Sequence, residues 1–113
     1  MAKLEYSFDG NKFPLEVIRE TVNREWERML SSKQFADRVA AADISRDDIP
    51  NDRERAITIE ESGDGLDPVT LTLLIGLGTA LTPKVAMIVE DLWKDVILPR
   101  IRQDKGENSL KEK

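Results

Sequence analysis

The feature that most constrains this chain is a nearly continuous apolar segment, residues 69–89, in a sequence of 113 residues. A segment that is apolar all round as a helix is either buried or spans a membrane. Pro83 and Lys84 interrupt the run after about a dozen residues, whereas a membrane span needs roughly 20. We therefore do not expect a membrane span, and we expect this segment to lie in the domain centre or against a partner.

Two helix-start signals divide this region. Asp67 precedes Pro68 and Thr82 precedes Pro83, so that a capping residue stands before a proline at the first helical position in both cases. The alternation of β-branched and leucine side chains over residues 69–73 favours a strand instead. The two capping signals lead us to predict two helices, over residues 68–81 and 83–98.

Four segments in the rest of the chain show a clear periodicity. Residues 4–8 and 55–61 alternate apolar and polar side chains, which predicts strands. Residues 14–31 place apolar side chains every three or four positions, which predicts an amphipathic helix. A further helix is predicted over residues 32–42, with Ser32 as its capping residue.

Together these elements predict an α+β fold. A small sheet of two or three strands packs against three to four amphipathic helices, and residues 68–98 form a C-terminal apolar helical hairpin. The length suits one domain, which we place at residues 1–105. The polar residues 106–113 are predicted to be a disordered tail.

The composition excludes several function classes. The chain has neither cysteine nor histidine, so thiol chemistry and histidine-dependent nucleophilic catalysis are absent, and a zinc site is disfavoured. The net charge of −5 opposes binding to nucleic acid. The start of the sequence lacks the apolar run of a signal peptide, so we expect a cytoplasmic protein. Because the side chains of the common nucleophilic systems are missing, we also expect that the protein is not an enzyme.

The leading functional hypothesis is a noncatalytic adaptor or oligomerisation domain. A helix that is apolar on all sides is hard to cover within so short a chain, and a second copy or another protein would cover it. The partner is therefore expected to be a protein, with a homo-oligomer as one form. The predicted interface lies on the helical hairpin and consists of Leu71, Leu74, Leu77, Ile88, Leu92 and Trp93.

The alternative hypothesis is a small acidic protein that binds Ca²⁺ through residues 43–54; otherwise no cofactor is expected. When this loop is aligned with an EF-hand loop, oxygen-bearing side chains fall at ligand positions: Asp43, Ser45, Asp47, Asn51 and Glu54. Two positions depart from that pattern, since Asp48 stands where the sharp turn needs glycine and Pro50 replaces an aliphatic residue. An acidic loop of this kind also suits a solvated connection between elements.

Two stretches carry a family resemblance. They are DGLDPVT at residues 64–70 and LWKDVILPRIR at residues 92–102, within the order strand, helix, strand, apolar helix. The region 55–102 resembles small uncharacterised bacterial domains, the effector-associated accessory components of conflict and signalling systems. The resemblance implies a noncatalytic domain that couples a sensor or processing protein to an effector. It includes no catalytic or ligand motif, so it assigns no site residue.

Overall fold

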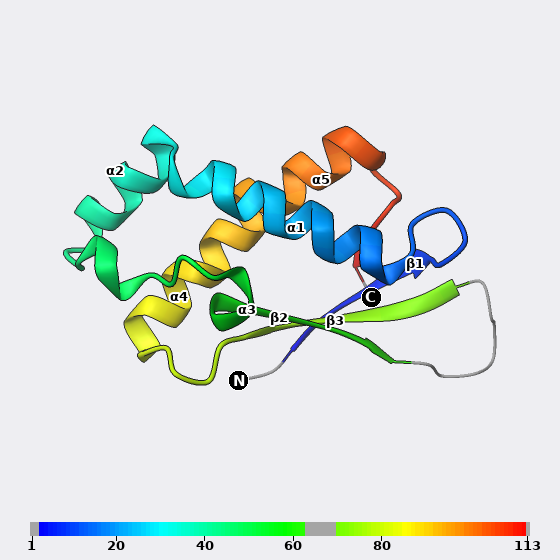
Figure 1. Cartoon of the computed structure of the whole chain (residues 1–113), viewed down its shortest axis with the longest axis horizontal. Coiled ribbons are helices and arrows are strands. Elements are labelled where there is room, and N and C mark those ends of the chain that lie inside the picture. Colours follow the sequence, from blue (N-terminus) through cyan, green and yellow to red (C-terminus); the bar gives the residue numbers. More distant parts are fainter. Residues whose placement is uncertain (1–2, 63–69, 113) are drawn as a thin grey trace.

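The computed structural model of the chain describes residues 3–62 and 70–112. Within them a four-stranded antiparallel sheet has the order β2-β3-β1-β4, and the helices lie on one face of it (Figure 1). The strands are β1 (Leu4–Asp9), β2 (Ile57–Ser62), β3 (Thr70–Leu77) and β4 (Lys111–Glu112). The α+β class is confirmed, and the sheet has four strands rather than the predicted two or three.

The helical elements follow the predicted order in the first half of the chain and differ from it in the second. They are α1 (Leu15–Leu30), α2 (Lys33–Ala41), the 3₁₀ turn η1 (Arg46–Asp48), α3 (Arg53–Ala56), α4 (Pro83–Leu92), the π-turn η2 (Trp93–Ile97) and α5 (Leu98–Lys105). The predicted helices over residues 14–31 and 32–42 are confirmed as α1 and α2. The Ser32 hydroxyl accepts a hydrogen bond from the Phe35 amide at 3.2 Å, which is the expected N-cap.

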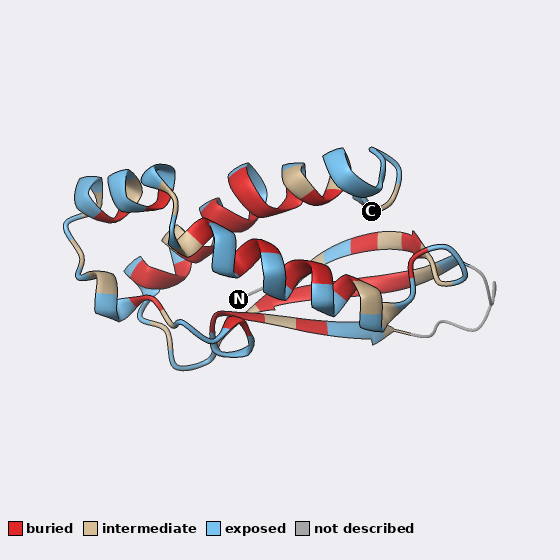
Figure 2. Cartoon of the chain, turned by 45° about the horizontal axis from the view of Figure 1, so that its top comes forward, coloured by how far each residue is buried: buried red, intermediate tan, exposed pale blue. Residues whose placement is uncertain are grey.

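The strand register explains which face of the sheet is buried. Tyr6 lies opposite Leu73, and Ile59 lies opposite Ile75, so these side chains form one apolar face beneath the helices. Figure 2 shows buried residues alternating with exposed or intermediate ones along α1 and along the strands. On the other face of the sheet, Leu74 lies between Glu5 of β1 and Glu60 of β2, as expected for a solvated surface.

The prediction of a helix over residues 68–81 is wrong for the described part, because residues 70–77 form strand β3. β3 is the strand between β1 and β2, with Leu73 and Ile75 on the face beneath the helices and Leu74 on the opposite face. Close packing explains the glycines in and just after this strand: a Cβ at Gly76 would lie 2.6 Å from Thr58 Oγ1, and one at Gly78 would lie 1.9 Å from the Arg55 carbonyl oxygen. The predicted cap at Asp67 lies outside the described residues.

The second half of the predicted hairpin is a helix, but it does not end at residue 98. The Thr82 hydroxyl caps α4 by accepting a hydrogen bond from the Val85 amide at 3.3 Å. Pro99 has no N–H for the carbonyl four residues before it, and its ring crowds that carbonyl. The chain widens into η2, where the Leu98 amide bonds to the Trp93 carbonyl, and then continues as α5.

The C-terminal segment differs from the predicted disordered tail over residues 106–112. Leu110 is fully buried in the core, and residues of β4 pair with Tyr6 and Ser7 of β1. Arg102 Nε and Nη2 donate hydrogen bonds to the Leu110 carbonyl oxygen at 3.2 and 2.9 Å. A single leucine among polar residues gives too weak a sequence signal for such a contact, because its pocket is formed by distant elements.

Candidate functional site

The predicted interface residues do not form one surface. Two of them are in the core, with exposed fractions of 0% for Leu92 and 1% for Trp93. Three others are partly buried against that core, namely Leu71, Leu77 and Ile88. Leu74 lies on the opposite face of the sheet, since it is paired with Glu5 and Glu60. These six residues therefore do not share one exposed surface, and residues 70–77 form strand β3 where the prediction placed the first helix of the hairpin.

Trp93 instead joins the helical layer to the sheet. Its indole N–H donates a hydrogen bond to the Tyr6 hydroxyl at 2.9 Å, and the two rings meet edge to face at 5.9 Å between centroids. Burial raises the pKa of Tyr6 above its usual value of 10.0, while the hydrogen bond from Trp93 lowers it. The pair is thus a satisfied polar contact within the core.

Two residues of the calcium hypothesis, Asn51 and Glu54, are engaged by arginines of the same segment. Arg46 donates to the Asn51 side-chain oxygen and to the Ile49 carbonyl at 3.0 Å, so a guanidinium group lies among the proposed ligands. Asp47 belongs to the first turn of η1, and Glu54 lies 3.8 Å from Arg53. Asp43 adopts a positive φ of 56° next to the end of α2. Among the described residues no cluster of three or more acidic side chains could hold a metal ion.

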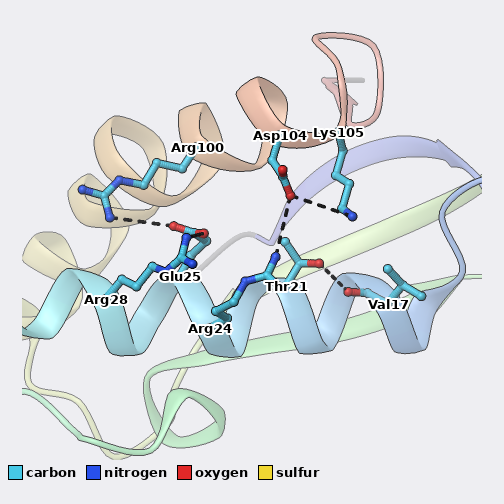
Figure 3. A network of polar contacts seen from close by, with 8 residues as sticks. All are labelled: Val17, Thr21, Arg24, Glu25, Arg28, Arg100, Asp104 and Lys105. Carbon is cyan, nitrogen blue, oxygen red and sulfur yellow. Dashed lines mark hydrogen bonds and ion pairs between the residues drawn. The ribbon is translucent and has the colours of Figure 1, made fainter.

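A polar cleft between α1 and α5 is the most distinctive feature of the surface. Its volume is about 590 Å³. The residues that line it are Arg24, Glu25, Arg28, Arg100, Gln103, Asp104 and Lys105. Figure 3 shows the charged side chains of this cleft reaching across from the two helices. We refer to these seven residues as the α1/α5 cleft.

Glu25 lies at the base of the α1/α5 cleft with only 6% of its side chain exposed. Its Oε1 accepts a hydrogen bond from Arg28 Nη1 at 3.1 Å. Its Oε2 lies 3.7 Å from Arg100 Nη1, which is an ion pair but is too long for a hydrogen bond (Figure 3). Within the described residues Glu25 Oε2 has no hydrogen-bond donor. A buried acceptor without a donor costs about 1–3 kcal/mol, so this atom favours a ligand that supplies one.

The rim of the cleft is basic although the chain as a whole is acidic. Four basic side chains (Arg24, Arg28, Arg100 and Lys105) face two acidic ones (Glu25 and Asp104), which leaves a local excess of two positive charges. The whole chain carries −5. Asp104 lies 3.7 Å from Arg24 and 3.8 Å from Lys105, and all three side chains are more than one third exposed. Exposed pairs of this kind contribute little to stability, so they are free to rearrange around a ligand.

Sequence reasoning missed this cleft, although one signal was present. Glu25 follows Val22 by three residues and precedes Met29 by four, so a carboxylate stands within the apolar stripe of α1. Its ion-pair partner Arg100 lies on α5, far along the chain. Nothing in the sequence shows that these two side chains meet, because their contact depends on α5 lying beside α1.

Comparisons with known proteins give no match: neither a protein-family model, nor a curated protein, nor a solved structure is similar to this chain at a significant level. In the described segments no helix combines the length and the apolar character that crossing a bilayer requires.

Proposed function

We propose that this chain is a noncatalytic protein-interaction domain that binds an acidic segment of a partner protein in the α1/α5 cleft. The observation that carries the proposal is the buried Oε2 of Glu25, which lacks a donor inside an otherwise basic cleft. An acidic peptide meets both requirements, since its carboxylates pair with the arginines and its backbone N–H groups can donate to Oε2 once the side chains around this buried atom turn towards the peptide.

Simpler ligands fit the cleft less well. A small anion has only acceptors and would compete with Glu25 for Arg28 and Arg100. A cation would satisfy Glu25 but would meet the excess positive charge of the rim. A peptide that alternates acidic side chains with amide donors can contact the base and the rim together. The cleft residues also do not include a nucleophile next to a general base, the arrangement that nucleophilic catalysis needs.

The arginines at the rim are available for such contacts. Arg28 and Arg24 have side chains that are 64% and 51% exposed, so a partner can reach them without unfolding α1. Arginine is suited to carboxylates because its planar guanidinium forms two parallel hydrogen bonds. Charge complementarity of this kind also raises the association rate, and the effect weakens as salt is added.

The test uses a fluorescent peptide that alternates glutamate with serine, together with a second peptide in which lysine replaces glutamate. The glutamate peptide is expected to bind, and salt is expected to weaken the binding. The double substitution Arg24→Glu and Arg28→Glu should raise its Kd by about tenfold or more. The lysine peptide should not bind the unaltered domain.

The matched control makes the same total charge change away from the cleft, with Arg55→Glu on α3 and Lys84→Glu on α4, where both side chains are exposed. Equal losses for the cleft and control variants would show that only overall charge matters, and the proposal would be wrong. Absence of binding by the glutamate peptide would also overturn it. Thermal unfolding of each variant confirms that the fold is intact.

A further inference from the structure

The C-terminal segment is held by contacts that a second copy of the chain could supply. Leu110 is fully buried, and its carbonyl oxygen accepts two hydrogen bonds from Arg102. The next residues, Lys111 and Glu112, lie opposite Ser7 and Tyr6 of β1. The hydrogen bonds and the strand pairing join the segment to α5 and β1, and none depends on the direction from which the segment arrives. The same segment of another copy would fit the same site.

The connection between α5 and this segment is short and is closed by a few hydrogen bonds. Gly106 ends α5 with a φ of +105°, which a residue with a side chain adopts only with strain. Its carbonyl oxygen accepts hydrogen bonds from the Ser109 amide at 3.1 Å and the Ser109 hydroxyl at 2.7 Å. Glu107 and Asn108 between them are exposed. Opening this turn therefore breaks few contacts and disturbs no core residue.

The sheet offers strand addition at β1 and not at β2. The outward carbonyl groups of Ile57 and Ile59 in β2 already accept hydrogen bonds from Arg53 at 2.8 Å and Arg19 at 3.1 Å. A strand that approached β2 would have to displace both arginines. In β1, by contrast, β4 pairs with two of the six residues in the described part of the chain.

We propose that two copies of this chain exchange residues 107–112, so that β4 of one copy pairs with β1 of the other. The exchanged dimer keeps the Leu110 and Arg102 contacts and pairs the same strands, while the turn at Gly106 opens into a link between copies. Such exchange is a low-cost route to a dimer, and short connections favour it. Because each copy's own segment competes at an effective concentration of roughly millimolar order, the dimer is expected to increase with protein concentration.

The test exploits the absence of cysteine from the chain. One preparation carries Ser7→Cys, and a second preparation, with a size tag, carries Lys111→Cys. The two are mixed at high concentration and treated with a short thiol cross-linker. These positions lie opposite each other in the β1–β4 ladder, so a tagged–untagged dimer forms efficiently only if the segment has exchanged. A single chain with both substitutions provides the control for closed, intramolecular cross-linking.

Chance collisions are measured with a mixture of Lys84→Cys and Lys111→Cys chains, because Lys84 lies on the exposed first turn of α4. The exchange predicts several times more mixed dimer than in this control, and more at higher concentration. Equal yields in the two mixtures would overturn the proposal.

Deletion of Glu107 and Asn108 should shift the chain further towards dimers in sedimentation, and a strictly monomeric deletion variant would also contradict the exchange. The cleft variant Arg24→Glu with Arg28→Glu should leave the cross-linking unchanged, which separates this proposal from the peptide-binding function.

Discussion

The two edges of the sheet are protected in different ways. Along β2, side chains cover the edge: Arg53 and Arg19 donate to carbonyl groups that would otherwise face a neighbouring strand. Along β1, a segment of backbone covers the edge, held by the buried Leu110 and by Arg102. A side chain that covers an edge stays with its own helix, whereas a segment can be supplied by another molecule. The comparison shows that the β2 edge is protected by side chains that stay with their own helices. The β1 edge is protected by a segment that a second copy of the chain could also supply.

The largest expected effect is at the β1 edge, with Leu110→Ala. Removal of a fully buried leucine side chain leaves a cavity and should lower the free energy of unfolding by about 2–4 kcal/mol. Urea denaturation measures this change. The neighbouring Lys111→Ala is the control, since its side chain is exposed and should cost less than about 0.5 kcal/mol. If both variants were equally stable, the C-terminal segment would not be part of the core.

The next effect concerns the β2 edge, with Arg53→Met. Arg53 donates to the Ile57 carbonyl and to the Asn23 side-chain oxygen at 2.6 Å, and its side chain is 6% exposed. Burial lowers its pKa from the usual value, and the substitution leaves two acceptors without their donor. We expect a loss of about 2 kcal/mol in the free energy of unfolding.

The control for this variant is Arg55→Met on the same short helix, where the arginine is exposed. A loss as small as that of the control would mean that Arg53 does not hold the β2 edge. Sedimentation of Arg53→Met tests the comparison further. When the β2 edge is uncovered, chains should associate through β2. The Ser7→Cys and Lys111→Cys pair would not detect this association, because it reports only pairing between β1 and β4.

A smaller effect is expected from Tyr6→Phe within β1. At neutral pH the loss of the hydrogen bond from Trp93 should cost about 1 kcal/mol. Because the pKa of Tyr6 is raised in the folded chain, its contribution to stability is complete below pH 10.0 and decreases as the pH rises above that value. The phenylalanine variant should therefore lose less stability than the unaltered chain under alkaline conditions.

Tyr6 is the single tyrosine of the chain, so the ultraviolet absorbance of its phenolate reports this group alone. The folded chain should titrate at a higher pH than the chain in denaturant. Coincident titration curves would show that the hydroxyl is solvated and that the inner face of β1 is open to water.

The smallest effect is expected for Arg19→Ala. This side chain is exposed apart from its hydrogen bond to the Ile59 carbonyl oxygen, so the substitution should lower the free energy of unfolding by about 0.5 kcal/mol. Thermal unfolding measures it against Glu20→Ala, an exposed neighbour on α1. A loss as large as that of Arg53→Met would contradict the view that burial makes Arg53 the main cover of the β2 edge.

The parts of the fold that were predicted from sequence depend on local signals. The stripe of α1, the Ser32 cap of α2 and the Thr82 cap of α4 act within one or two turns, so their residues are near each other in the chain. The strand β3 was predicted as a helix because the two capping signals, Asp67-Pro68 and Thr82-Pro83, were given more weight than the strand-like alternation of residues 69–73. Its neighbours β1 and β2 decide the matter, and they come from distant parts of the sequence.

The candidate site was predicted less well than the fold. The proposed interface required the helical hairpin, and its residues Leu92 and Trp93 are in the core instead. The unusual position of Glu25 in the apolar stripe of α1 was visible in the sequence, but its partner Arg100 was not. An amino-acid pattern reports which side chains share a face of one helix, and it says nothing about which second helix covers that face.

The sequence by itself determined the α+β class, the main helices of the first half and the chemistry that a chain without cysteine and histidine lacks. Only the tertiary structure decided that residues 70–77 are a central strand, that Glu25 and Arg100 share a cleft, and that Leu110 closes the β1 edge. The physical reason is the range of the interactions. Caps and helical periodicity act over a few residues, whereas burial of a strand, an ion pair between helices and cover of a sheet edge depend on segments that only the folded chain brings together.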